Sequence, residues 1–213
     1  MQLHGRAALI VIDVQESFRQ DPGWETISNP GIVGQVKRLV DAARANGDLV
    51  IWVLHAEAGS DTLFDPASGY VRLIDGLAVQ DGEPVITKTS HNAFTTTNLQ
   101  QILTSQGISE VVICGIRTEQ CCETTARVAS DFGFGVTFVT DATATSPIEH
   151  WDAQPGRGAD EILADPRTLQ VDDILARTEY ALAGRFATIR TVAELAGDAT
   201  TAAPSMTGGA TTA

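Results

Sequence analysis

Short apolar runs rich in β-branched residues recur along the chain, and they do not alternate with polar residues. The clearest are Ala7–Val14, Leu49–His55, Val111–Gly115 and Val136–Thr140. Strands that are buried on both faces of a parallel sheet show this uninterrupted pattern, whereas half-exposed strands alternate. The runs therefore predict a parallel sheet with helices on both of its faces.

Segments with apolar residues at helical spacing separate these runs. Helices are predicted over about 32–43, 99–103 and 122–129, each closed by a glycine, and over about 171–183. A last short strand is expected within 186–191, and residues 147–167 are expected to form a long loop or a short helix with loops. Strands alternating with helices indicate the α/β class. We expect a three-layer α/β/α domain with a mostly parallel, Rossmann-like sheet.

Composition is that of a globular protein with an acidic surface. The chain has 213 residues, of which 43% are hydrophobic and 19% charged, enough apolar side chain for a sizeable core. With 27 acidic and 14 basic residues the formal net charge is −13. Phosphate backbones and anionic lipid surfaces would repel such a chain, so neither nucleic acid nor membrane is an expected partner.

The chain reads as one domain over 1–196 followed by a low-complexity tail over 197–213, which we expect to be flexible. The apolar run Ala7–Ile12 is too short to span a membrane. Three cysteines, an odd number, argue against a disulfide framework and for a reducing compartment. A cytoplasmic protein is expected.

Polar residues stand where several predicted strands end. In open α/β sheets ligands bind outside the carboxyl ends of the strands, so Asp13, His55 and Lys88 are candidates for a site. A carboxylate that ends a fully apolar strand is costly unless it is paired or functional. His55 has no second histidine or aspartate at metal-ligand spacing and is interpreted as a hydrogen-bonded polar residue. No glycine-rich dinucleotide or Walker-type phosphate loop occurs.

The strongest local signal is the segment CGIRTEQCCETTARVA, residues 114–129. A strand ends at its start, and Cys121 falls near the first turn of the following helix. The unpaired N–H groups and positive dipole of a helix start favour a thiolate and can hold an oxyanion. Cys114 lies inside the strand and Cys122 is expected to face the core beside Val112, so both are interpreted as structural.

These residues, in this order, resemble the isochorismatase-like cysteine hydrolases, a family that includes nicotinamidases and N-carbamoylsarcosine amidases. The resemblance extends from about Leu3 to Leu195. It rests on Asp13-Val14-Gln15 followed by Phe18, on Lys88 before Ala93-Phe94, Thr97 and Leu99, on Gly115, Thr118, Cys121 and Thr125-Ala126, and on Asp141-Ala142.

The resemblance implies a catalytic triad of Asp13, Lys88 and Cys121. It also implies a cis peptide between Ile116 and Arg117, with the backbone N–H groups of Arg117 and Cys121 as the oxyanion hole. In such a site Lys88 stabilises the thiolate, and Asp13 takes the thiol proton and passes it to the leaving amine. Planar amides, ureides or carbamoyl groups suit this chemistry.

Other properties follow from the same resemblance. Nicotinamidases of the family carry an Asp-x-His metal cluster after the second strand, where this chain has Leu54-His55-Ala56-Glu57. We therefore expect no metal and no cofactor. A homodimer or homotetramer is expected. The residues expected to contact a small-molecule substrate are Gln15, Phe18, Trp24, His91, Phe94 and Glu119, with Arg117 also shaping the pocket.

Three functional hypotheses remain open at this point. The leading one is a cysteine amidohydrolase that forms a thioester on Cys121. The second is a hydrolase of isochorismate type, in which Asp13 would protonate a vinyl ether. The third is a catalytically silent α/β binding protein.

Overall fold

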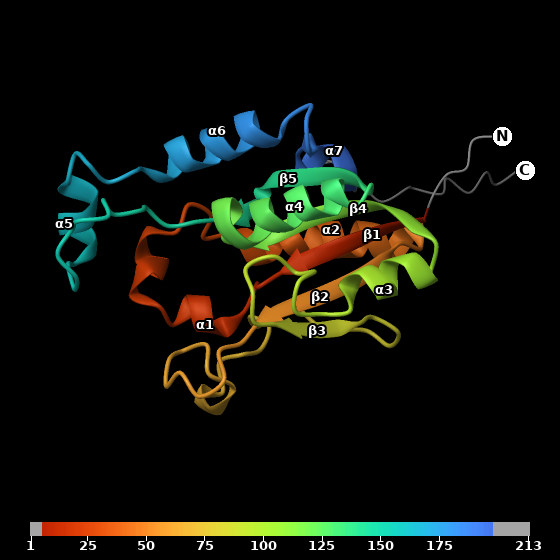
Figure 1. Cartoon of the computed structure of the whole chain (residues 1–213), viewed down its shortest axis with the longest axis horizontal. Coiled ribbons are helices and arrows are strands. Elements are labelled where there is room, and N and C mark those ends of the chain that lie inside the picture. Colours follow the sequence, from red (N-terminus) through yellow and green to blue (C-terminus); the bar gives the residue numbers. More distant parts are fainter. Residues whose placement is uncertain (1–5, 198–213) are drawn as a thin grey trace, which may run out of the picture.

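The computed structural model describes residues 6–197, apart from the side chain of Arg6. Within that range one sheet runs through the molecule (Figure 1). Its strands are β1 (Arg6–Ile12), β2 (Leu49–His55), β3 (Val85–Lys88), β4 (Ile108–Ile116), β5 (Gly135–Ala144) and β6 (Thr188–Arg190). The strand order is β3-β2-β1-β4-β5-β6, and every pairing is parallel.

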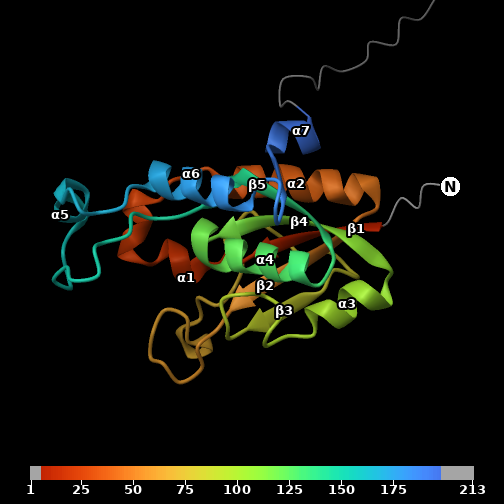
Figure 2. The ribbon, with the colours of Figure 1, turned by 45° about the horizontal axis from the view of Figure 1, so that its top comes forward.

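The main helices are α2 (Ile32–Asn46), α3 (Leu99–Ser105), α4 (Glu123–Asp131) and α6 (Val171–Leu182). Shorter ones are α1 (Glu16–Arg19), α5 (Ala159–Ala164) and α7 (Val192–Ala196), with 3₁₀ turns η1 (Pro22–Thr26) and η2 (Pro66–Ser68). Figure 2 shows α2 and α7 on one side of the sheet and α3 and α4 on the other. The predicted three-layer α/β/α fold is confirmed.

Strand β1 shows why the apolar runs do not alternate. Ala8, Ile10 and Ile12 pack into one core with α3, α4 and the end of α6. Leu9 and Val11 pack into the other core with α2 and α7. Both faces of the strand are buried, so each position favours an apolar side chain.

The four strands and four helices expected from the sequence are present, with small differences in their ends. The expected strand within 186–191 is β6, and the segment 147–167 contains only the short helix α5. Two short helices, α1 and α7, were not predicted, because four or five residues give too little periodicity to detect. Cys122 faces the core, as expected. Val112 packs against the opposite core, so the two are not neighbours.

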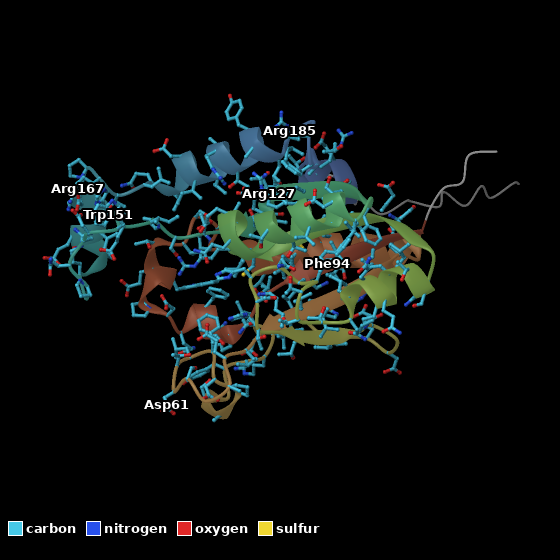
Figure 3. The ribbon with its side chains drawn as sticks, viewed as in Figure 1. Asp61, Phe94, Arg127, Trp151, Arg167 and Arg185 are labelled. Atoms are coloured by element: carbon cyan, nitrogen blue, oxygen red, sulfur yellow. The ribbon has the colours of Figure 1, made fainter. Side chains whose placement is uncertain are left out.

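The segment around α5 stands away from the sheet (Figures 1 and 2). Trp151 and Arg167 lie together there, whereas Arg127 lies on α4 and Asp61 in the loop after β2 (Figure 3). Arg167 pairs with Asp152 and Asp165, and Arg157 with Glu149 and Asp165. Ion pairs thus hold this segment, while Trp151 is 89% exposed.

None of the helices among residues 6–197 is both long and apolar enough to cross a membrane. The cytoplasmic location stays a prediction, as does the homo-oligomer. The expected tail boundary at 197 lies at the edge of the described residues, and 198–213 lie outside them.

Candidate active site

Three neighbouring strands bring polar residues to the carboxyl edge of the sheet. Asp13 follows β1, with its backbone N–H donating to the carbonyl of Val53 at 2.9 Å and its φ at +53°. His55 ends β2 and Lys88 ends β3, and the two are register partners. The side chain of Lys88 extends past β2, so that its Nζ lies 2.8 Å from Asp13 Oδ2.

The turn after β4 carries the cysteine into the same place. The peptide bond between Ile116 and Arg117 is cis, at the position that the resemblance implies. Residues Thr118–Cys122 then form a π-helical turn, η3, which continues directly into α4. Such turns occur most often at functional sites. Cys121 therefore lies in the first turn of a helix, as predicted.

Gly115 allows this turn to approach β1. Its φ is +132°, and a Cβ placed on it would lie 1.9 Å from the carbonyl oxygen of Ile12. Any side chain here would push β4 away from the strand that carries Asp13. The glycine thus sets the short distance between the cysteine turn and the aspartate.

Glu123, the first residue of α4, ties the turn to the C-terminal part of the chain. It is 4% exposed, and it accepts hydrogen bonds from Arg127 Nε at 3.0 Å and from the Thr178 hydroxyl at 3.1 Å. Arg177 also pairs with this carboxylate. Two residues of α6 therefore hold the helix that follows Cys121.

Asp13, Lys88 and Cys121 form a compact buried cluster. Lys88 Nζ lies 3.4 Å from Cys121 Sγ in addition to its 2.8 Å contact with Asp13. Asp13 and Lys88 have no exposed surface, and Cys121 is 7% exposed. The predicted triad residues are therefore brought together, with the ammonium contacting both the thiol and the carboxylate.

Burial dominates the ionisation of this cluster. It raises the pKa of Asp13 above its usual value, although Lys88 opposes the shift. Burial also raises the pKa of Cys121 to about 12, with the Asp13 charge adding to the shift and Lys88 opposing it. The helix start by itself predicts a shift toward the thiolate, whereas burial shifts the pKa of Cys121 in the other direction, because loss of water disfavours the charged form.

A cavity of about 380 Å³ opens onto this cluster. Of the residues predicted for the site, Asp13, Phe18, His91, Arg117 and Cys121 line the cavity, and Lys88 lies behind them without lining it. His55, Glu57, Phe64 and Gln120 also line it. Sequence reasoning placed His55 at this edge but gave it no role, and no pattern marked Glu57 or Phe64, which lie beyond the strand end.

Four residues predicted to contact substrate do not line the cavity. Gln15 has no exposed surface, and its side chain bonds to both backbone groups of His55 and to the Ser17 hydroxyl. Phe94 is buried against Phe132 and Phe134. Neither side chain lines the cavity.

The other two also lie outside the cavity lining. Trp24 packs against the core beneath α2. The carboxylate oxygens of Glu119 are buried and have no hydrogen-bond partner among residues 6–197. Because Glu119 lies two residues before Cys121 on a π-helical turn, its side chain projects from a different side of the turn than the thiol. Ile116 is a core residue and takes part only through its backbone.

His55 lies between Lys88 and Glu57 and contacts both. Its Nδ1 lies 3.3 Å from Lys88 Nζ, and its Nε2 lies 3.2 Å from Glu57 Oε1. An ammonium only donates hydrogen bonds, so Nδ1 is the acceptor and the proton sits on Nε2, facing the carboxylate. Within residues 6–197, no group of three or more His, Cys, Asp or Glu side chains has the geometry to hold a metal ion.

The parallel α/β fold and the buried cluster of Asp13, Lys88 and Cys121 at the sheet edge agree with the family that the sequence resembles. The isochorismatase domain model matches residues 7–164, so the chain belongs to the isochorismatase family and is related to its hydrolases. The expected family and fold are confirmed.

Relatives illustrate the range of the family. The chain is 34% identical over 162 residues to a protein of Arabidopsis thaliana named as a probable inactive nicotinamidase, covering 67% of this chain and 82% of the relative. It is 36% identical over 152 residues to a streptothricin hydrolase of Streptomyces noursei, covering 70% of this chain and 57% of that protein. The crystal structure of a cysteine hydrolase from Pseudomonas syringae pv. phaseolicola 1448A superposes with a TM-score of 0.75 at 26% identity, covering 90% and 91% of the two chains.

Proposed function

We propose that this protein is a cysteine amidohydrolase that cleaves the C–N bond of a small amide, ureide or carbamoyl compound. The observation that carries the proposal is the contact of one buried ammonium, Lys88, with both the thiol of Cys121 and the carboxylate of Asp13. A nucleophile, a base and a fixed positive charge are the parts that acyl transfer through a thiol requires.

The first step is attack on the carbonyl carbon. Asp13 takes the proton of Cys121 as the sulfur bonds to that carbon, and Lys88 compensates the negative charge of the cluster. A base near neutrality serves best in proton transfer, and burial shifts the pKa of Asp13 in that direction. The raised pKa of the thiol makes the thiolate short-lived but strongly nucleophilic once formed.

The carbonyl oxygen becomes an oxyanion in this step. The backbone N–H groups of Arg117 and Cys121, which bracket the turn at the carboxyl end of β4, are the proposed donors to it. Donors fixed by the backbone need no rearrangement as charge develops, and each is worth about 2.7–4 kcal/mol in comparable enzymes.

The remaining steps restore the enzyme. Asp13 passes its proton to the leaving nitrogen as the C–N bond breaks, which releases ammonia or an amine and leaves a thioester on Cys121. Asp13 then takes a proton from water, whose oxygen attacks the thioester, and the proton returns to the sulfur as the acid is released. The balance is one amide and one water consumed, with one acid and one amine formed.

A silent binding protein is the second candidate, because one relative is named as a probable inactive nicotinamidase. A vinyl ether hydrolase is the third, and it needs Asp13 as a proton donor but not Cys121. Ammonia release from a panel of small amides and ureides, together with turnover of isochorismate, separates the three hypotheses.

The expected result is ammonia release that Cys121→Ala abolishes and Cys122→Val preserves. Cys122 is the matched control because it is an adjacent cysteine that is fully buried in the core. Trapping of an acyl group on Cys121, seen as an added mass, would identify the thioester. Turnover of isochorismate that survives Cys121→Ala would contradict the proposal.

A further inference from the structure

Arg117 is the one residue whose side chain adds a cation to the cavity without a carboxylate partner among residues 6–197. Eight other arginines pair with carboxylates: Arg19, Arg44, Arg72, Arg127, Arg157, Arg167, Arg177 and Arg190. Arg38 and Arg185 also form no ion pair among residues 6–197, but they do not line the cavity. In a chain with 27 acidic and 14 basic residues, Arg117 is thus the unpaired guanidinium that a ligand in the cavity can reach.

The surroundings hold the guanidinium in place but do not use its donors. Its central carbon lies 5.8 Å from the ring centroid of Phe18, near the outer limit of a cation–π contact. A Cβ placed on Gly23 would lie 3.9 Å from Arg117 Nη2, so the group reaches the wall that η1 forms. No side-chain hydrogen bond from Arg117 occurs among the described residues, which leaves its planar row of N–H groups available.

The two carboxylates that line the cavity already have partners within the protein. Asp13 is paired with Lys88, and Glu57 contacts His55. Glu57 follows β2 and Arg117 follows β4, on opposite sides of β1, so a ligand anion is drawn to the Arg117 side and repelled from the Glu57 side. The cavity is thus positively charged at its Arg117 end and negatively charged at its Glu57 end.

From this we infer that Arg117 is a specificity-determining residue that pairs with a carboxylate of the substrate, while the amide carbon lies at Cys121. The substrate class is therefore a small amide or carbamoyl compound that also carries a carboxylate, and this inference rests on the proposed function. A guanidinium binds a planar carboxylate through two parallel N–H···O bonds, which a neutral group of the same size does not form.

Matched substrates test the inference. Succinamate is compared with 4-methylpentanamide, and N-carbamoylglycine with isobutylurea, because in each pair an isopropyl group replaces the carboxylate at nearly equal volume. We expect kcat/KM for the acid to exceed that for its neutral partner by about 10- to 100-fold, the range of a charge-assisted hydrogen-bonded pair. In Arg117→Met this acid-to-neutral ratio should fall at least about tenfold, and Arg117→Lys should retain part of it.

The test uses the acid-to-neutral ratio of kcat/KM because any effect of Arg117→Met on the turn itself should lower both values equally and cancel. Arg72→Met is the matched control, since Arg72 is an arginine outside the cavity lining and pairs with Asp75. It should keep the ratio of the unmodified protein. An unchanged ratio in Arg117→Met would overturn the inference.

A binding measurement keeps this test separate from the proposed function. Succinamate should slow the alkylation of Cys121 by iodoacetamide at lower concentration than 4-methylpentanamide, and Arg117→Met should remove the difference. If no amide is hydrolysed but this protection is seen, the proposed chemistry fails and the carboxylate site stands. If amides are hydrolysed and protection is equal for both compounds, the carboxylate site fails and the chemistry stands.

Discussion

Gln15 binds both backbone groups of His55 with one side chain. Its Oε1 accepts from the His55 N–H at 2.7 Å, and its Nε2 donates to the His55 carbonyl at 3.0 Å. The pair extends the contact between β1 and β2 by one step beyond the last strand residues. Gln15 therefore fixes the position of the His55 backbone, and it does not itself line the cavity.

Replacing this amide should cost stability. Gln15→Leu leaves a buried N–H and C=O of His55 without partners, and we expect a loss of about 2–4 kcal/mol in the free energy of unfolding. Urea unfolding measures it. Gln101→Leu, at an exposed position on α3, should change stability by less than about 0.5 kcal/mol. Equal changes in the free energy of unfolding for the two substitutions would show that the hydrogen bonds to His55 do not contribute to stability.

The contributions of Asp13 and Lys88 to stability should depend on each other. Lys88→Met leaves the Asp13 carboxylate buried without a counter-charge, and we expect a loss of about 3–5 kcal/mol at pH 7. Asp13→Asn combined with Lys88→Met should lose less than the sum of the two single substitutions. Removal of the exposed pair Lys37–Asp41 serves as the control and should cost under about 1 kcal/mol.

The pH dependence of the Lys88→Met variant has a definite sign. Burial raises the pKa of Asp13, so the folded state favours the protonated carboxyl more than the unfolded chain does. The deficit of the variant relative to the unmodified protein should therefore shrink as the pH falls from 8 toward 5, and grow as it rises. A deficit that stays constant over this range would contradict the buried charge as its cause.

Alkylation should identify Cys121 both by rate and by pH. Cys121 lines the cavity, whereas Cys114 and Cys122 have no exposed surface, so iodoacetamide should modify Cys121 first. Because burial raises the pKa of Cys121 to about 12, the rate should rise about tenfold per pH unit from pH 7 to 9 without a plateau. Peptide mapping with time and pH measures both. A plateau near pH 7, or earlier modification of Cys122, would refute this.

Gly115 should tolerate no side chain. Gly115→Ala places a Cβ 1.9 Å from the backbone oxygen of Ile12, and we expect a loss above about 4 kcal/mol or failure to fold. Gly107→Ala is the control, because Gly107 also has a positive φ, +66°, but open space around its Cα. It should cost only about 1–2 kcal/mol, the local backbone penalty. Circular dichroism during thermal unfolding compares the two.

Activity should survive exhaustive chelation with EDTA. The cavity contains His55, Glu57 and His91, but no three such side chains among residues 6–197 converge as metal ligands. Ammonia release before and after chelation measures this. Loss of activity that a divalent ion restores would assign a ligand role to one of these residues.

The sequence predicted the fold, and it predicted which polar residues meet at one edge of the sheet, because both follow from strand patterns. Apolar runs that do not alternate place β1 in a two-sided core, and the residues after such strands meet at one edge, which brought Asp13, His55 and Lys88 together. The contacts of Gln15 could not be predicted, since an amide at a strand end suits a ligand and a neighbouring backbone equally. The effect of burial on the pKa of Cys121 could not be predicted, since a helix start is visible in sequence, whereas the depth of burial is not.

The hydrogen bonds of Glu123 have a consequence for where this molecule can be divided. The match to the isochorismatase domain model ends at residue 164, yet Arg177 and Thr178, which hold the first residue after the cysteine turn, lie beyond it. A chain cut after Ala164 would also lose β6. The end of the domain-model match is thus not a physical boundary. In divergent members of the family, the identity of the residue at the start of α4 should change together with the segment that follows residue 164.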